Sequence, residues 1–328
     1  MFTEFFYQVQ DYLVYCRTKG LANKTIKSYE QSLGLFVRYC EEEHKIEKAQ
    51  KVTKKVIVEY LTYVRDRGKY TTVSDELSRR SNNPHNRTDL GKRVSAATVN
   101  NYLRNIKAFY TYCMEFQIIK KNPTDTLKAI PNKRKAKDFI SDLQFKMLLR
   151  VFNLSSFVEF RDYVITNLLM DTGMRITECL LIKVEDLDLN KRAIFLPAQN
   201  TKGKKDRIVY FSNEMNLLLK RWLKYKDIYT NSEYLFSTQR GNAFKNAVFE
   251  KNFKNYCNRI ELKNVSPHTL RNNFAKRFLM NGGNIFTLSQ ILGHSSVTVT
   301  EQAYLDLTDE DIRQSYQDFS PLAKMRNR

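Results

Sequence analysis

The sequence lacks the features that define several large protein classes. Its five cysteines are odd in number and widely spaced, at positions 16, 40, 113, 179 and 257, so neither a disulfide framework nor a zinc site is predicted. No apolar run is long enough to span a bilayer, and the N-terminus lacks the basic and apolar regions of a secretory signal. We expect a soluble, cytoplasmic protein with no membrane span and no metal site.

Negative charge is also scarce. The chain has 55 Lys and Arg against 35 Asp and Glu, a formal net charge of +20. Such an excess repels itself in a folded protein unless a polyanion compensates it, which favours nucleic acid as the partner. The partner that we expect is double-stranded DNA. A basic protein that is merely soluble is the simple alternative. A membrane-surface role is disfavoured because the basic residues are spread over the whole chain.

The length of 328 residues predicts two domains. Four stretches with apolar residues at helical spacing occupy the first 120 residues, and we expect the four helices to share one core in a domain spanning 1–130. Thr53 and Ser95 are candidate caps, and Gly20 is a candidate helix end. The apolar stripes are Val9/Leu13/Cys16, Tyr29/Leu33/Phe36/Val37/Cys40, Ile57/Tyr60/Leu61/Val64 and Val99/Leu103/Ile106/Tyr110/Cys113.

The opposite faces of the second and fourth predicted helices carry cationic and polar side chains that suit phosphate and base-edge contacts. A solvated helix face has the same composition, so groove contact is a hypothesis. The candidates are Lys24, Thr25, Lys27, Asn101, Arg104, Asn105 and Lys107.

Two polar segments interrupt the helical pattern. Residues 69–93 contain almost no apolar side chains, and we expect a mobile loop there. A basic stretch around Pro131 predicts an interdomain linker over 131–140. Its Lys133, Arg134 and Lys135 would pass beside the phosphate backbone if both domains bind DNA.

The second domain, 141–328, begins with a predicted capping box formed by Ser141 and Gln144. Apolar segments at 194–196 and 208–211 flank a Gly-Lys-rich turn and predict a β-hairpin. The expected fold is therefore mainly α with a small antiparallel β-sheet, and the second domain is a mixed α+β unit.

The C-terminal region carries side chains that suit attack on a phosphodiester. Ser266 is predicted to cap a helix with Pro267 at its first position, and such helix starts bind anions. His268 and Arg271 share a face of that helix, so both can contact one phosphate. The ordinary alternative is a surface ion pair for Arg271 and a cap-region role for His268.

A further helix near 284–292 is predicted to end at Gly293 and to place His294 just beyond it. Residues 298–301 resemble a capping box for a short helix that holds Tyr304. A single tyrosine is usually a packing residue, so the case for Tyr304 rests on its neighbours. With Arg175 included, the motifs supply two guanidiniums, two imidazoles and one phenol.

Together these motifs resemble the tyrosine site-specific recombinases of the phage integrase family. The matching segments are Thr172-Gly173-Met174-Arg175-Ile176-Thr177-Glu178, Lys202 in Thr-Lys-Gly-Lys, His268-x-x-Arg271, Leu292-Gly293-His294 and Tyr304. The resemblance covers nearly the whole chain. It implies an N-terminal helical core-binding domain, a C-terminal catalytic domain and no cofactor.

The resemblance also implies a role for each matched residue. Arg175 and Arg271 would clamp the scissile phosphate, and His268 and His294 would assist with hydrogen bonds and protons. Tyr304 would attack phosphorus and form a 3′-phosphotyrosyl link.

Two supporting roles follow from the same resemblance. Lys202 would protonate the leaving 5′ oxygen, and its choice over Lys204 and Lys205 in the same turn follows from the family pattern. Glu178 would support Arg175 without reacting itself.

The C-terminal tail places Ile312, Tyr316, Phe319 and Leu322 on one helical face. In the family such a tail docks into a neighbouring subunit, which implies a homotetramer on paired DNA sites. The alternative is a helix folded against its own domain. In either case Tyr316 is interpreted as a packing residue.

Three competing functions share some of these features. A metal-dependent nuclease would need clustered carboxylates, and Glu185, Asp186 and Asp188 are the candidates, although they suit a solvated turn better. A DNA-binding regulator without catalysis would not need the isolated Tyr304. A relaxing topoisomerase shares the chemistry, but the two-domain layout and the tail favour site-specific recombination, in the integration, excision or resolution of a mobile element or replicon.

Overall fold

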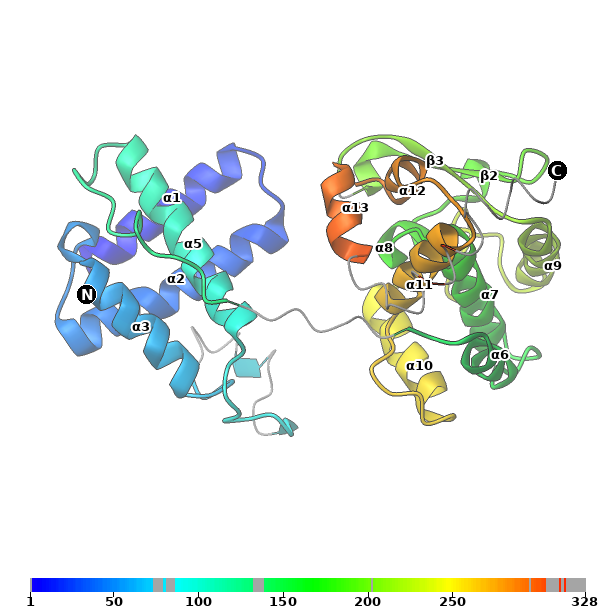
Figure 1. The fold of residues 1–328 in the computed structure, drawn as a ribbon, viewed down its shortest axis with the longest axis horizontal. Helices are drawn as coiled ribbons and strands as arrows, with labels where there is room; N and C mark the ends of the chain where they lie inside the picture. The colour runs from blue at the N-terminus through cyan, green and yellow to red at the C-terminus, as the bar shows by residue number, and fades with distance from the viewer. Residues whose placement is uncertain are drawn as a thin grey trace. The chain divides into compact units, whose positions relative to one another are not determined.

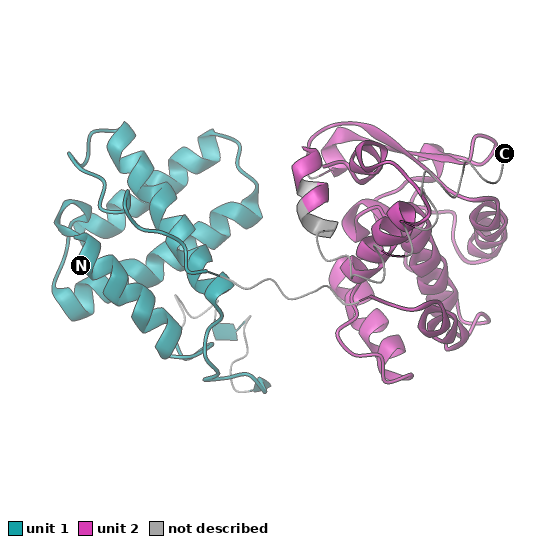
Figure 2. Ribbon diagram, in the orientation of Figure 1, with its two compact units in different colours: residues 1–134 teal, residues 135–328 magenta. Residues whose placement is uncertain are grey.

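A computed structural model of the chain describes residues 2–72, 79–80, 86–131, 139–201, 203–294, 296–304, 313 and 316. The chain divides into two compact units, 1–134 and 135–328, which Figure 2 colours separately. The described parts are mainly helical, with a 3-stranded antiparallel sheet in the second unit. The predicted fold class is confirmed. None of the described helices is both long and apolar enough to cross a membrane.

The first unit contains the four helices that the apolar stripes predict (Figure 1). The side chains of Thr3, Thr53 and Ser95 cap three of them by accepting a backbone N–H. Gly20, just beyond the first helix, has a φ of +68°, as its predicted place at a helix end requires. The helices are α1 (Glu4–Thr18), α2 (Asn23–His44), α3 (Lys54–Asp66) and α5 (Ala96–Glu115), with a 3-10 turn at Ala49–Lys51.

Aromatic side chains fill much of the core of this unit. Phe5, Phe36 and Tyr60 form a chain of ring contacts, with centroids 5.9 Å apart for Phe5–Phe36 and 4.9 Å apart for Phe36–Tyr60. Each ring is 0% exposed. The predicted apolar stripes thus meet in one core, as four amphipathic helices require.

The described ends of the polar segment 69–93 are paired with each other. The Lys69 amide donates to the Lys92 carbonyl at 2.9 Å, and the Gly91 amide donates to the Lys69 carbonyl at 3.0 Å. A Cβ on Gly68 would lie 2.5 Å from the Gly91 oxygen, so only glycine allows this close approach. The middle of the predicted mobile loop lies outside the described residues.

The second unit is built around α7 (Phe157–Thr172), which packs against α9, α10 and α11 (Figure 1). Its buried residues cover most of the helix surface, and Tyr163, Asn167 and Met170 form the one half-buried face. The predicted capping box of Ser141 and Gln144 opens α6. The other helices are α6 (Asp142–Arg150), α8 (Ile176–Cys179), α9 (Asn213–Tyr229), α10 (Asn246–Asn258), α11 (Pro267–Met280), α12 (Ile285–Leu292) and α13 (Val297–Tyr304).

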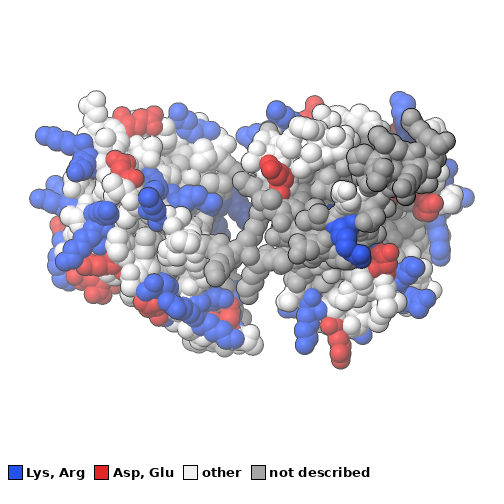
Figure 3. All heavy atoms as spheres, in the orientation of Figure 1, with Lys and Arg blue, Asp and Glu red and all other residues white. Residues whose placement is uncertain are grey.

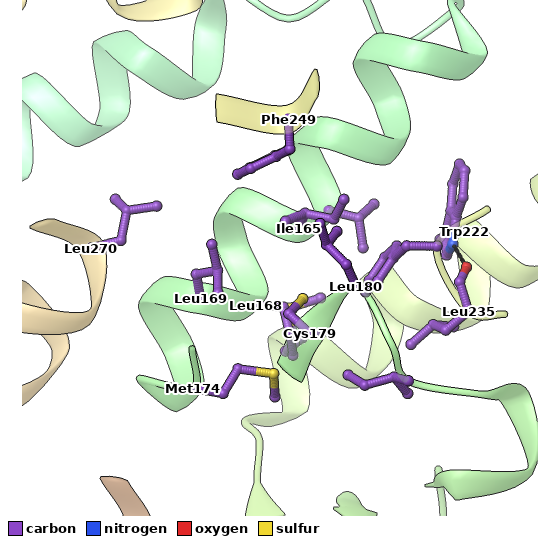
Figure 4. Close-up of a cluster of buried hydrophobic side chains, with 14 of the residues drawn as sticks. Ile165, Leu168, Leu169, Met174, Cys179, Leu180, Trp222, Leu235, Phe249 and Leu270 are labelled. Carbon is purple, nitrogen blue, oxygen red and sulfur yellow. Dashed lines mark hydrogen bonds between the residues drawn. The ribbon is translucent and has the colours of Figure 1, made fainter. Parts of the chain in front are cut away.

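Figure 4 shows part of the core in which α7 lies. Ile165, Leu168 and Leu169 of α7 are each 0% exposed and belong to the same cluster as Phe249. The Trp222 ring is buried there too, and its Nε1–H donates to the Leu235 carbonyl at 2.9 Å. The dashed line in Figure 4 marks this bond, which satisfies the only polar atom of the indole.

The predicted hairpin forms two strands of the sheet. Strand β2 (Ala193–Leu196) pairs antiparallel with β3 (Arg207–Tyr210), with Ala193 opposite Tyr210 and Leu196 opposite Arg207. A short β1 (Leu187–Asp188), which was not predicted from the sequence, pairs with the other edge of β2. The register puts Arg207 at the end of the hairpin next to the connecting turn.

Candidate active site

Arg175 follows a sharp helix end. Helix α7 stops at Gly173, whose φ of +64° suits glycine, and a Cβ there would lie 2.2 Å from Cδ1 of Phe274. The backbone amide and Nη1 of Arg175 both donate to Glu178, each at 2.9 Å. Nη2 donates to the Gly293 carbonyl at 3.4 Å. The guanidinium is therefore held from two sides.

Glu178 is a buried anionic anchor, with its side chain 0% exposed. Arg207 reaches it from β3, with Nη1 3.1 Å from Oε1 and Nη2 2.6 Å from Oε2. Burial by itself raises the pKa of this carboxyl, but the hydrogen bonds and charge of Arg207, and then those of Arg175, hold the pKa of Glu178 below its ordinary value. The carboxylate is therefore ionised at neutral pH and pairs with both arginines.

Arg271 lies in the first turns of α11 and is 4% exposed. Its Nη1 donates to the Gly173 carbonyl at 2.8 Å, and its Nη2 donates to the Leu292 carbonyl, also at 2.8 Å. The same Nη2 lies 3.0 Å from Nε2 of His294. Arg271 is therefore a buried cation bound to both distant motifs, and the surface ion pair considered as its alternative is wrong.

His294 follows Gly293, which ends α12 with a φ of +62°, as predicted. Because a guanidinium has no acceptor, Nε2 of His294 must accept the hydrogen bond from Arg271. Nδ1 then carries the proton and donates to Oγ1 of Thr300 at 2.7 Å. The network assigns this neutral tautomer, and Thr300, at 0% exposure, is the group that orients the ring.

These contacts bring three separate sequence motifs together. Arg271 donates to Leu292 and Arg175 donates to Gly293, so the two guanidiniums bind carbonyls of consecutive residues at the end of α12. A helix C-terminus carries partial negative charge and favours cations. The result is a pair of fixed guanidiniums beside one imidazole.

A pocket of about 260 Å³ adjoins this cluster. Thr201 organises the turn on its rim: its hydroxyl donates to the Lys205 carbonyl at 3.0 Å and accepts the Lys205 amide at 3.2 Å. The described lining residues are Thr201, Gly203, Lys205, Asp206, Arg207, Gln290, Gly293 and His294. The lysine-rich turn and the histidine motif thus share one cavity.

Of the remaining predicted site residues, the structure describes His268 and the backbone of Tyr304. His268 is exposed in the first turn of α11, on the helix capped by Ser266 as predicted. The backbone of Tyr304 ends α13, whereas its side chain and Lys202 lie outside the described residues. Helix α13 begins at Val297, so the prediction that Thr298 caps it is wrong.

The candidate DNA-contact residues of the first unit fall into two groups. Lys24, Thr25, Lys27 and Arg104 are exposed, and Asn101 is half-buried. Lys107 instead donates to the Leu127 carbonyl at 2.7 Å. Asn105 is 1% exposed and donates to Ser32 at 2.8 Å, so its assignment to a DNA-facing surface is wrong. Lys133, Arg134 and Lys135 lie outside the described residues.

The acidic candidates for a metal site are engaged in local turns. Asp186 accepts the Lys183 amide at 3.0 Å, and Asp188 accepts the amides of Asn190 and Lys191 at 3.0 and 2.8 Å. Within the described ranges, no three His, Cys, Asp or Glu side chains are grouped as ligands of one metal ion.

Comparison with known proteins decides the family. The phage integrase family matches residues 139–311, and the N-terminal SAM-like domain of phage integrases matches residues 9–79. The chain belongs to the phage integrase family. It is a tyrosine recombinase, an enzyme that breaks and rejoins DNA.

Curated relatives span the whole recombinase. Tyrosine recombinase XerD of Oceanobacillus iheyensis is 25% identical over 324 residues, covering 97% of this chain and 99% of the relative. Tyrosine recombinase XerD of Staphylococcus haemolyticus is 26% identical over 329 residues, covering 96% and 99%.

Solved structures share the fold. The Tn1549 transposon integrase in complex with transposon right end DNA matches with a TM-score of 0.70 and 19% identity, covering 95% of this chain and 99% of that one. The XerH recombinase bound to difH substrate matches with a TM-score of 0.63 and 20% identity, covering 90% and 79%.

Two residues of the candidate active site were not predicted from the sequence. Arg207 was not singled out, because its partner Glu178 is 29 positions away and only the tertiary fold joins them. Thr300 was not singled out either, although it lies six residues after His294. The one local signal for Arg207 was its position four residues after Gly203, the glycine of the turn.

Proposed function

We propose that this recombinase cleaves and rejoins specific DNA sites through a covalent 3′-phosphotyrosyl intermediate. The observation that carries the proposal is the buried Arg271, which binds the Gly173 and Leu292 carbonyls and His294 at once. Burial of a cation costs desolvation free energy, so a buried arginine that joins three motifs indicates a function for its charge. Stabilisation of a phosphate is the function that best accounts for it.

In the proposed cleavage step, the Tyr304 oxygen attacks phosphorus as the bond to the 5′ oxygen breaks. Arg175 and Arg271 stabilise the charge that develops on the nonbridging oxygens, and loss of one such donor typically costs about 10²- to 10³-fold in rate. Lys202 gives its proton to the departing 5′ oxygen. His268 and His294 assist with hydrogen bonds and protons, and Nε2 of His294 becomes available for this when the phosphate replaces it at Arg271.

Rejoining reverses the same steps. A 5′-hydroxyl of a second DNA strand attacks the phosphotyrosyl ester, the tyrosine leaves, and a phosphodiester forms again. The ester retains the energy of the original bond, so ligation needs no nucleotide cofactor. Exchange of strands between two sites in this way integrates, excises or resolves a mobile element or replicon.

The first unit is proposed to bind duplex DNA through exposed residues of α2 and α5, with the linker residues Lys133, Arg134 and Lys135 beside the backbone. Two paired sites need four active sites, and we propose that the C-terminal tail links four copies into a homotetramer. The enzyme would meet this DNA in the cytoplasm.

An adduct assay tests the proposal. The protein is mixed with supercoiled plasmid that carries DNA from the flank of its own gene, in excess chelator, and detergent-resistant protein–DNA adducts are measured. The parent and the control Tyr316→Phe should form adduct and recombinant product, whereas Tyr304→Phe should form neither. Equal product from Tyr304→Phe would remove the proposed nucleophile, and cleavage that chelator abolishes would indicate a metal-dependent nuclease.

A further inference from the structure

Arg207 is a nearly buried arginine at the start of β3, with its side chain 10% exposed. Both of its terminal nitrogens bind Glu178, at 3.1 and 2.6 Å, in the bidentate geometry that guanidinium and carboxylate groups prefer. Its Nε donates to the Ile291 carbonyl at 3.3 Å. One side chain therefore joins the hairpin, α8 and the end of α12.

The end of α12 is fitted closely to this guanidinium. A Cβ on Gly293 would lie 3.0 Å from Cδ and 3.1 Å from both Nε and Cζ of Arg207. Gly293 also has a φ of +62°, so its lack of a side chain serves both the helix end and the packing of Arg207. His294 is the next residue, and its position follows from this contact.

Arg207 is also connected to Arg175, through the shared carboxylate of Glu178. Glu178 holds Arg175 through the backbone amide and Nη1, and it holds Arg207 through both oxygens. Without Arg207, each oxygen of the buried carboxylate would keep a single hydrogen bond, and both of these bonds come from Arg175. Arg207 thus limits the geometries open to the proposed phosphate clamp.

We propose that Arg207 is a positioning residue for DNA cleavage, which holds Arg175 through Glu178 and holds His294 through the end of α12. This inference rests on the proposed function. Arg207 lines the pocket, but its guanidinium binds Glu178 and Ile291, so it acts through its neighbours. Misplacement of a reacting group by about 1 Å can cost ~10²-fold in rate.

Arg207→Lys tests the inference because lysine keeps the charge but cannot form the bidentate contact. The matched control is Arg259→Lys. Arg259 forms a bidentate pair with Glu159 in the same unit, at 3.1 and 2.9 Å. Its guanidinium also contacts the Val151 carbonyl and the Tyr256 ring, neither of which belongs to the proposed site. Arg207→Gln, a neutral and shorter replacement, is the second variant in case the lysine form does not fold.

The assay is single-turnover cleavage of a duplex on which the parent forms adduct, nicked close to the cleavage point so that the released fragment diffuses away. The rate constant, the final amplitude and the DNA affinity are measured separately. We expect Arg207→Lys to cleave about 10- to 100-fold more slowly, with amplitude and affinity within about 2-fold of the parent. Arg259→Lys should match the parent.

Two results would overturn the inference. The first is a parent-like rate constant in both Arg207 variants. The second is a lower amplitude at the parent rate constant, which indicates a smaller folded fraction and a purely structural role. Failure of the proposed function is a separate observation, because then the parent itself forms no adduct or Tyr304→Phe forms as much.

Discussion

Thr300 shows how one hydroxyl sets the chemistry of a histidine. It accepts a hydrogen bond from Nδ1–H of His294 and so leaves Nε2 to accept from Arg271. The tautomer and the ring orientation both depend on this bond. A buried threonine one turn into α13 therefore belongs to the candidate site together with the histidine it binds.

Thr300→Val should slow DNA cleavage about 10-fold, because valine keeps the shape but removes the acceptor for Nδ1–H and leaves a buried polar group unpaired. Single-turnover cleavage measures the effect. Thr298→Val is the matched control, since Thr298 is exposed on the same helix. Equal rates for the two variants would show that the Thr300 bond does not orient His294.

Glu178 is the buried counter-ion of both Arg175 and Arg207. Glu178→Gln should lower the free energy of unfolding of the second unit by about 3 kcal/mol at pH 7, since two guanidiniums then lack their buried counter-ion. Trp222, the only tryptophan, reports this unit by fluorescence in urea. Glu159→Gln, which breaks a more exposed pair, should cost less than about 1 kcal/mol.

The pH dependence of this difference has a definite sign. The folded pKa of Glu178 lies below its ordinary value of 4.5, so its contribution to stability is complete above pH 4.5. It disappears as the pH falls through the folded pKa and the parent becomes protonated. A gap between parent and Glu178→Gln that persists at the lowest pH would contradict the assigned ionisation.

At the scale of the helices, Asn105 joins α2 to α5 inside the first unit. Its Nδ2 donates to Ser32 at 2.8 Å and lies 3.3 Å from the Ser28 hydroxyl. A buried amide with partners specifies how two helices align. This interface is therefore held by polar as well as aromatic contacts.

Asn105→Ala should destabilise the first unit by about 1–3 kcal/mol, because it removes buried hydrogen bonds and leaves a cavity. Hydrogen–deuterium exchange of peptides from α2 and α5 measures this loss without interference from the second unit. Asn101→Ala should leave exchange unchanged and weaken DNA binding instead. The reverse pattern would restore Asn105 to the DNA-facing surface.

Local sequence signals predicted most of the elements and several of their ends. The apolar stripes, the cap of Ser95 and the helix end at Gly293 depend on residues close in sequence, and each is confirmed. Asn105 and Arg207 could not be predicted, because a polar residue on a helix or strand has the same local pattern whether it faces water or a partner. Only the assembled helices and sheet decide between these outcomes.

For the whole molecule, the net charge of +20 predicts salt-dependent binding to DNA. On the face shown in Figure 3, described Lys and Arg side chains are spread over both units, with Asp and Glu between them. A dispersed pattern favours many separate phosphate contacts over a single cationic patch. Affinity should therefore fall steadily as salt rises.

Lys24→Ala and Lys27→Ala should each weaken DNA binding and lower the slope of log affinity against log salt by about 0.9, the value for one lost phosphate contact. Fluorescence anisotropy with labelled duplex at several salt concentrations measures the slope. Lys55→Ala on α3, whose side chain is 85% exposed, is the control and should not change it. Unchanged slopes in both α2 variants would remove this helix from the interface.

The measurement that tests the central claim most directly is identification of the residue that holds cleaved DNA. The parent is trapped on nicked duplex, digested with nuclease and protease, and analysed by mass spectrometry. The proposed chemistry predicts a nucleotide 3′-phosphate on Tyr304 and on no other residue. A nucleotide on a different side chain, or cleaved DNA with no modified peptide, would contradict it.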